Sequence, residues 1–126
     1  MAAVTGLDHV LLAMPSAGED RARAFYGALL GLMEIPKPPE LASRGGCWFA
    51  VPGSGPESGG QVHLGVQEGF IPARKAHPGL TVDNLEALVV ALEEAGATFT
   101  WDASIPGLRR GFVPDPFGNR VELIQA

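Results

Sequence analysis

The run Asp-Pro-Phe-Gly-Asn-Arg-Val-Glu-Leu, residues 115–123, joins a turn to a strand. Aspartate, proline, glycine and asparagine in its first five positions favour a reversal of the chain. The residues after them alternate between polar and apolar, which is typical of a strand with one buried face. Val121 and Leu123 are therefore expected to face the core, and Glu122 to point to the opposite side. The run predicts a hairpin that presents a carboxylate away from the core.

Around this hairpin, the second half of the chain contains one predicted helix and four predicted strands. Asp83 with Glu86 is a helix-start signal, and leucine and valine at helical spacing follow it as far as Ala95-Gly96. The strands are expected at residues 77–82, 98–101, 111–114 and 120–124. The second half therefore has the order β-α-β-β-β.

The first half of the chain repeats that order with little identity of residues. Ser16 and Glu19 form a capping-box pattern, and apolar residues at helical spacing follow it up to Gly31. Strands are expected at residues 7–14, 32–35, 47–51 and 61–67, with a Gly/Ser/Pro loop at residues 52–60. We predict an α+β fold in one domain, residues 1–126, with β-α-β-β-β modules at about residues 5–68 and 75–126. Because the link between them is short, the modules are expected to share one core or one cleft.

The composition is that of a packed acidic protein, since 46% of the 126 residues are hydrophobic and the formal net charge is -5. That charge argues against a nucleic-acid partner and against anionic membrane surfaces. No apolar run approaches the roughly 18 residues that span a bilayer, and the first residues lack the pattern of a secretion signal, so a cytoplasmic location is expected. Cys47, the only cysteine, excludes an internal disulfide and is expected to be buried beside Trp48.

Four residues with metal-binding side chains occupy matching places in the two halves. His9 and His63 lie in the first and last predicted strands of the first half, and His77 and Glu122 in those of the second. Strand alternation turns His63 and Glu122 away from the helix side. Each residue alone is most simply an ordinary strand residue, hydrogen-bonded or solvated. Their joint placement instead favours a metal site with three imidazoles and one carboxylate.

Several short motifs are spread along the chain: Leu7-Asp8-His9-Val10, Phe25-Tyr26, Leu30-Gly31-Leu32, His77 before Val82-Asp83-Asn84, and the run at residues 115–123. Together they resemble the vicinal oxygen chelate superfamily, which includes glyoxalase I, methylmalonyl-CoA epimerase, extradiol dioxygenases, fosfomycin-resistance transferases and bleomycin-binding proteins. The resemblance covers nearly the whole chain, and the last run is its most specific part. It implies a mixed sheet whose paired modules curl around a cleft that holds a divalent metal ion.

Position by position, the resemblance implies that the metal ligands are His9, His63, His77 and Glu122. Glyoxalase I and the epimerase resemble each other in having Glu or Gln where this chain has His63, so a possible second carboxylate base is missing. Glu122 is then the expected base as well as a ligand. His63 becomes a second acid or base if it does not bind the metal. Zinc, nickel, cobalt, manganese and iron(II) all suit these ligands.

Three functions remain open at this point. The leading one is a metal-dependent lyase or isomerase of the glyoxalase type, which acts on a small vicinal-oxygen substrate through a stabilised enediolate. His9, His77 and Glu122 also match the iron(II) triad of an extradiol-type dioxygenase. The third is a metal-free drug-binding resistance protein, against which a complete set of ligands argues. A homodimer is expected, because an open cleft in so small a chain leaves strand edges and apolar surface uncovered.

The sequence gives less specific evidence for the residues that line the walls of the cleft. Aromatic residues on strands are more often core than pocket, and the aromatic candidates are Trp48, Phe49, Trp101 and Phe112. Loop charges are more often solvated than bound to a ligand, and the candidate contacts for an anionic substrate are Arg74, Lys75, Arg109 and Arg110.

Overall fold

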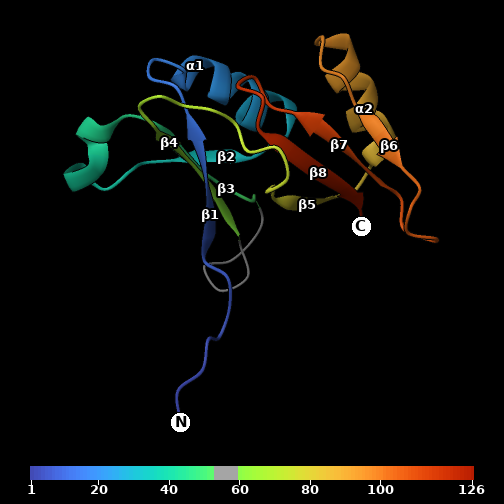
Figure 1. Ribbon diagram of the computed structural model, residues 1–126, viewed down its shortest axis with the longest axis horizontal. Helices are drawn as coiled ribbons and strands as arrows, with labels where there is room; N and C mark the ends of the chain where they lie inside the picture. Colours follow the sequence, from blue (N-terminus) through green and yellow to red (C-terminus); the bar gives the residue numbers. More distant parts are fainter. Residues whose placement is uncertain (53–59) are drawn as a thin grey trace.

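The computed structural model describes residues 1–52 and 60–126 (Figure 1). Within these residues the strands form two four-stranded sheets, and helices α1 and α2 lie along the same side of the molecule. The predicted α+β fold of two β-α-β-β-β modules is confirmed. The predicted Gly/Ser/Pro loop at residues 52–60 falls mostly outside the described residues.

The two sheets have the same topology. The first has the spatial order β1-β4-β3-β2, with β1 (His9–Met14), β2 (Met33–Ile35), β3 (Cys47–Ala50) and β4 (Gln61–Val66). The second has the order β5-β8-β7-β6, with β5 (Gly79–Val82), β6 (Thr100–Asp102), β7 (Arg110–Pro114) and β8 (Arg120–Gln125). In each sheet the first and last strands of the module run parallel, and the other neighbours are antiparallel. The repeat of pattern seen in the sequence is therefore a repeat of structure.

The prediction that His77 lies inside a strand is wrong, because β5 begins two residues later, at Gly79. The intervening Pro78 has no N–H group to donate to a neighbouring strand. Its carbonyl oxygen accepts the first bond of the ladder, from the N–H of Glu122 at 3.0 Å. His77 consequently lies in the loop just before β5, outside the second sheet.

Each sheet has one face in the core and one face turned away from it, called the open face below. Val62 and Leu64 of β4 are 3% and 0% exposed, and Val121 of β8 is 0% exposed, so these alternate residues form the core. Strand alternation then assigns His63 and Glu122 to the open faces, as the sequence predicted.

The helices with buried residues, one in each module, cover the core faces of the sheets, whereas the short 3-10 helix of the first module has no buried residue. The first module has α1 (Glu19–Ala22), which continues as the π-helical η1 (Arg23–Leu29), and a 3-10 helix, η2 (Pro39–Arg44), while the second has α2 (Leu85–Glu94). Tyr26 and Phe25 of η1 are buried in the core, as are Leu85, Val89 and Leu92 of α2.

Both predicted helix starts need correction. The first helix is preceded by Gly18, with no side-chain cap, because the chain turns at Ala17 with a φ of 62° and Ser16 is left outside. The second is capped by Asn84 rather than Asp83, since the Asn84 side chain accepts the N–H of Ala87 at 3.2 Å. Both patterns located the helices to within a few residues but named the wrong capping group.

The turn at residues 115–119 joins the two modules. Tyr26 of the first module donates its hydroxyl to Asp115 Oδ2 at 2.6 Å, and Asn119 donates Nδ2–H to the carbonyl oxygen of Ala13 at 2.8 Å. Burial, and then the charge of Asp115, raises the pKa of Tyr26, so the phenol keeps its proton as a donor. The most diagnostic run of the sequence is therefore also the joint between its halves.

Two smaller observations complete the fold. No helix in residues 1–52 or 60–126 is long and apolar enough to cross a membrane. Cys47 is a free thiol, and it is buried as predicted.

Candidate functional site

The four candidate metal ligands lie as two separate pairs. The first pair, His9 and His63, lies on the neighbouring strands β1 and β4, and the second pair, His77 and Glu122, lies just before β5 and on β8. No three His, Cys, Asp or Glu side chains in the described part of one chain are placed to hold a metal ion. The structure brings the members of each pair to one sheet and does not bring the two pairs together in one chain.

The two pairs occupy equivalent places in their modules. Trp48 of β3 is the cross-strand partner of His63, and Phe112 of β7 is the cross-strand partner of Glu122. An aromatic side chain therefore stands next to the candidate ligand on each open face.

In the first pair, His63 is sandwiched between two aromatic rings. Its ring centroid is 3.7 Å from that of Trp48 and 4.1 Å from that of His9, and both contacts are stacked. Its Nε2 is 2.8 Å from Oε1 of Gln61. Burial, and then the neighbouring His9, lowers the pKa of His63 to about 4. His63 is thus an uncharged imidazole at neutral pH.

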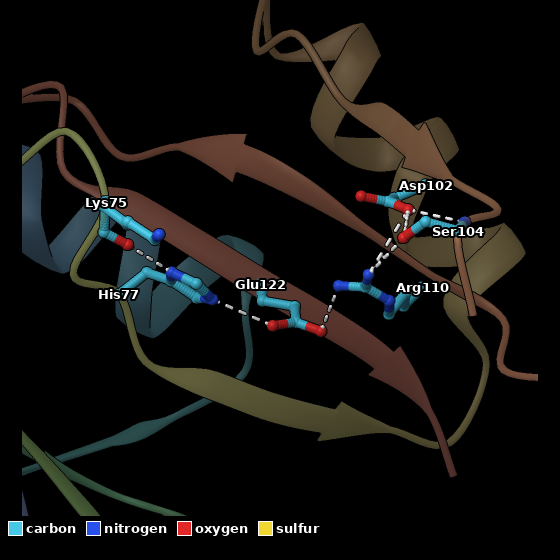
Figure 2. A network of polar contacts seen from close by, with 6 residues as sticks. All are labelled: Lys75, His77, Asp102, Ser104, Arg110 and Glu122. Atoms are coloured by element: carbon cyan, nitrogen blue, oxygen red, sulfur yellow. Dashed lines mark hydrogen bonds and ion pairs between the residues drawn. The ribbon is translucent and has the colours of Figure 1, made fainter.

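In the second pair, His77 faces two oxygen atoms. Its Nδ1 is 2.6 Å from the carbonyl oxygen of Lys75, and its Nε2 is 3.0 Å from Oε1 of Glu122 (Figure 2). A bond from Nδ1–H to a backbone carbonyl is the contact that orients metal-binding imidazoles and leaves Nε2 for the metal. His77 is therefore oriented as a ligand, with Nε2 directed towards the carboxylate of Glu122.

Glu122 is held from both sides. Its Oε1 faces His77, and its Oε2 accepts from Nη1 of Arg110 at 2.9 Å. Nη2 of the same arginine donates to Ser104 Oγ at 3.0 Å and lies 3.3 Å from Asp102 Oδ1 (Figure 2). Burial raises the pKa of Glu122, but the hydrogen bonds from His77 and Arg110 outweigh it, and the pKa lies below its usual value. The result is an ionised carboxylate in a fixed orientation.

A hollow of about 550 Å³ lies beside the second pair. Phe112 forms part of its wall, and the ring of Phe112 meets the ring of His77 edge-on, with centroids 5.3 Å apart. Arg120 also lines the hollow, and its guanidinium carbon lies 3.8 Å from the centre of the Phe112 ring. Residues 71–74, in the loop before β5, form the other side. The hollow has room for a small molecule, and Phe112 separates that space from His77 and Glu122.

Some of the predicted wall residues lie elsewhere. Phe49 is 0% exposed and belongs to the core, because it alternates with Trp48 along β3. Trp101 is covered by Arg109, whose guanidinium carbon is 3.8 Å from a ring centre of Trp101 and whose Nε donates to Glu86 at 2.9 Å. Trp48 and Phe112 are thus the aromatic candidates that lie beside the two pairs.

The arginines were the least predictable part of the site. Arg110 was a candidate contact for an anionic substrate, but it binds Glu122 instead. Arg120 was not among the candidate contacts for an anionic substrate. Its position two residues before Glu122 was the available signal, because residues at that spacing on a strand share a face.

The sequence model of a glyoxalase-like domain family matches residues 10–124. The chain belongs to this family. The motif-based resemblance to the vicinal oxygen chelate superfamily is confirmed by this match and by solved structures of glyoxalase/bleomycin resistance/dioxygenase proteins. No curated protein matches the chain in sequence.

Solved structures similar to this glyoxalase-like chain include a glyoxalase family protein from Bacillus anthracis. It is 41% identical, with a TM-score of 0.88, and the alignment covers 99% of this chain and 98% of that one. A genomically encoded fosfomycin resistance protein from Listeria monocytogenes is 13% identical, with a TM-score of 0.74 and coverage of 98% and 95%. Lactoylglutathione lyase from Agrobacterium tumefaciens is 17% identical, with a TM-score of 0.68 and the same coverage. The last two share the fold.

A divalent metal ion suits the donors of this glyoxalase-like chain but needs both pairs. Catalytic zinc sites use three protein ligands, and each pair supplies two side chains. The orientation of His77 by a backbone carbonyl fits a metal ligand. The chemistry of the donors therefore fits a metal only where a first pair and a second pair meet.

Proposed function

We propose that this glyoxalase-like chain is a metal-dependent lyase or isomerase that moves a proton on a small molecule with vicinal oxygens. The second pair carries the proposal, because it sets an oriented imidazole beside an ionised carboxylate, and Phe112, which lies next to both, lines a hollow. A carboxylate base close to a metal ligand is what proton transfer from carbon next to an oxygen requires.

In this proposal the metal is held by the second pair of one chain and the first pair of a second copy. The open face of the first sheet supports a two-chain site, because Leu11 and Met33 on it are 60% and 54% exposed. A second copy packed on this face would bury both of these apolar side chains. A two-fold homodimer covers them and brings a first pair to each second pair.

The chain's own residues then have distinct tasks. Glu122 accepts the proton from the substrate carbon and returns it. Arg110 keeps that carboxylate ionised and aimed, since it binds Oε2 and is itself held by Ser104 and Asp102. His63, uncharged at neutral pH, is available as a ligand or as a second acid or base. When bound, a divalent metal ion supplies positive charge beside the substrate oxygens, which makes the neighbouring C–H group more acidic.

A metal-free binding protein is the second candidate function, and the stack of Trp48, His63 and His9 favours it. Parallel aromatic rings form a flat surface on which a planar drug packs well. Nε2 of His63 already has an amide partner in Gln61, so it needs no metal ion to satisfy it. This function predicts binding without metal and no chemical turnover.

Metal binding in mixtures of two variants tests the proposed function. His9→Ala disables a first pair and His77→Ala disables a second pair, and both side chains are partly exposed, so the fold is expected to survive. Each variant alone should lose tight binding of Zn²⁺, Ni²⁺, Co²⁺, Mn²⁺ or Fe²⁺, measured by elemental analysis after dialysis. Random exchange of subunits in an equal mixture should restore about a quarter of the sites, because each mixed dimer contains one intact site of its two.

The outcomes separate the candidate functions. No recovery of metal in the mixture would place any metal site within one chain and would overturn the two-chain site. Failure of the parent protein to bind any of the five ions would favour the metal-free binding protein. Consumption of oxygen with catechols by the iron-loaded parent would replace the proposed lyase or isomerase with an extradiol-type dioxygenase. The parent mixed with itself is the control for losses during exchange.

A further inference from the structure

The hollow near the second pair has two positively charged side chains in its wall. Arg120 and Arg74 both line it. Neither arginine lies within ion-pairing distance of a carboxylate in residues 1–52 or 60–126. In a chain with a formal net charge of -5, two such arginines in one concave site form a local positive region.

Arg110, a third arginine near the hollow, differs from these two because its charge is bound within the protein. Its side chain is only 10% exposed, and it bonds to Glu122 on one side and to Ser104 and Asp102 on the other. Its charge is used within the protein. The same contacts compensate the charge of Glu122, so that carboxylate repels an anion in the hollow less strongly.

Arg120 is oriented without being neutralised. Its guanidinium carbon lies 3.8 Å from the centre of the Phe112 ring, and a contact of this kind fixes the guanidinium plane while its charge remains. The N–H groups at the edge of such a plane suit two oxygens of a carboxylate or phosphoryl group. Phe112 is also the cross-strand partner of Glu122. An anion at Arg120 therefore lies beside Phe112, one strand away from Glu122.

We propose that the hollow binds the oxyanion of a small substrate, a carboxylate or a phosphoryl-type group, with Arg120 as the main contact and Arg74 at the rim. The substrate class is thus an organic acid with a small apolar part that packs on Phe112. This inference rests on the proposed function for the identity of the ligand as the substrate. Binding of the anion itself needs no metal ion, and it is tested without one.

The test is a titration of the metal-free full chain with phenylacetate and phenylphosphonate, and with neutral 2-phenylethanol for comparison. Binding is followed by NMR of the arginine Nε–H groups. Both anions should shift the Arg120 signal, and the better of the two identifies the preferred oxyanion. Arg120→Gln should weaken both anions by about tenfold, and Arg74→Gln, in the exposed loop, by about threefold. The alcohol should bind about tenfold more weakly than the anions and should not respond to either change.

Two further variants make the result specific. Arg21→Gln is the matched control, because the Arg21 guanidinium carbon also lies over an aromatic ring, 5.0 Å from the centre of Phe117, but Arg21 does not line the hollow. It should bind the anions like the parent. Arg120→Lys keeps the charge and should retain part of the affinity that Arg120→Gln loses.

Equal affinity of the parent and Arg120→Gln for both anions would overturn the inference, and so would equal affinity of the parent for the alcohol. The proposed function fails independently, on metal binding in the mixed variants. Anion binding without metal binding would leave a recognition site for acids in a protein that is not a metal-dependent enzyme.

Discussion

The two modules share one topology but differ in charge at two matching positions. Gly46 stands two residues before Trp48, where Arg110 stands two residues before Phe112 in the second module. Similarly, Gln61 precedes His63 by two residues, as Arg120 precedes Glu122. The first open face is consequently neutral at these positions, and the second has two cations.

At the position of Gly46 and Arg110, the difference has a steric cause in the first module and an electrostatic cause in the second. Gly46 has a φ of 83°, and a Cβ atom there would lie 2.0 Å from the carbonyl oxygen of Leu64, so this position excludes an arginine. Glu122, by contrast, is a partly buried carboxylate that requires a partner, and Arg110 provides it. Duplicate folds can therefore divide the chemistry, with the uncharged imidazole of His63 in one module and charged groups in the other.

The largest expected effect comes from neutralising Glu122, the carboxylate of the second pair. In Glu122→Gln, the side chain keeps an oxygen that can bind metal but no longer accepts a proton at neutral pH. Exchange of the substrate α-hydrogen with solvent deuterium should fall by about 10²- to 10⁴-fold. The measurement is NMR of metal-loaded protein with hemithioacetals, α-hydroxy ketones and acyl-CoA esters. Metal content should fall less than in His77→Ala.

Glu86→Gln is the matched control for that change, because Glu86 is an exposed carboxylate of the same module that pairs with Arg109 away from the site. It should exchange hydrogen like the parent. If Glu122→Gln also exchanged as fast as the parent, the base would have to come from the first module, and His63 would be the next candidate.

The uncharged imidazole of the first module, His63, should affect how the free energy of unfolding depends on pH. The pKa of His63 is about 4 in the folded chain, against 6.5 for a free imidazole, so the unfolded chain takes up this proton first. In metal-free protein, the contribution of His63 to the free energy of unfolding is fully present above pH 6.5. It declines as the pH falls from 6.5 to about 4, and it does not change further below that pH. The total loss is up to about 3 kcal/mol.

Denaturant unfolding of the parent and of His63→Gln at pH 7 and pH 4.5 measures this contribution. The difference in unfolding free energy between the two proteins should shrink at the lower pH. His77→Gln serves as the comparison from the second module and should keep the decline seen in the parent. A difference between parent and His63→Gln that does not change with pH would show that the stacked imidazole is not shielded as the structure indicates.

The smallest expected effect concerns the hydrogen bond between Tyr26 of the first module and Asp115 of the second. Tyr26→Phe removes the buried hydroxyl that donates to Asp115 at 2.6 Å. The free energy of unfolding should fall by about 1–2 kcal/mol, since one hydrogen bond to a charged acceptor is lost. Thermal unfolding followed by circular dichroism measures this loss. Asp115→Asn should be worse than Tyr26→Phe, because both carboxylate oxygens accept hydrogen bonds and an amide keeps only one of them: Oδ1 accepts the N–H groups of Phe117 and Asn119, and Oδ2 accepts Nδ2–H of Asn119. An equal loss would mean that these additional bonds contribute little.

The sequence predicted best what depends on neighbours along the chain. The alternation in residues 120–124 assigned Val121 to the core and Glu122 to the open face, and both positions agree with the structure. Helix starts were less accurate, because a capping pattern does not show whether a residue such as Ala17 turns the backbone first. His77 was misplaced for a similar reason, since Pro78 ends the hydrogen-bonded ladder.

The sequence by itself determined the order of elements, the two modules, and the equivalent places of His63 and Glu122, because periodicity and turn residues act over a few positions. Only the tertiary structure decided which partners these side chains meet. It separated the four candidates into two pairs, enclosed His63 between Trp48 and His9, and assigned Arg110 to Glu122. Contacts between strands depend on register and burial across the sheet, and spacing along the chain contains no measure of either.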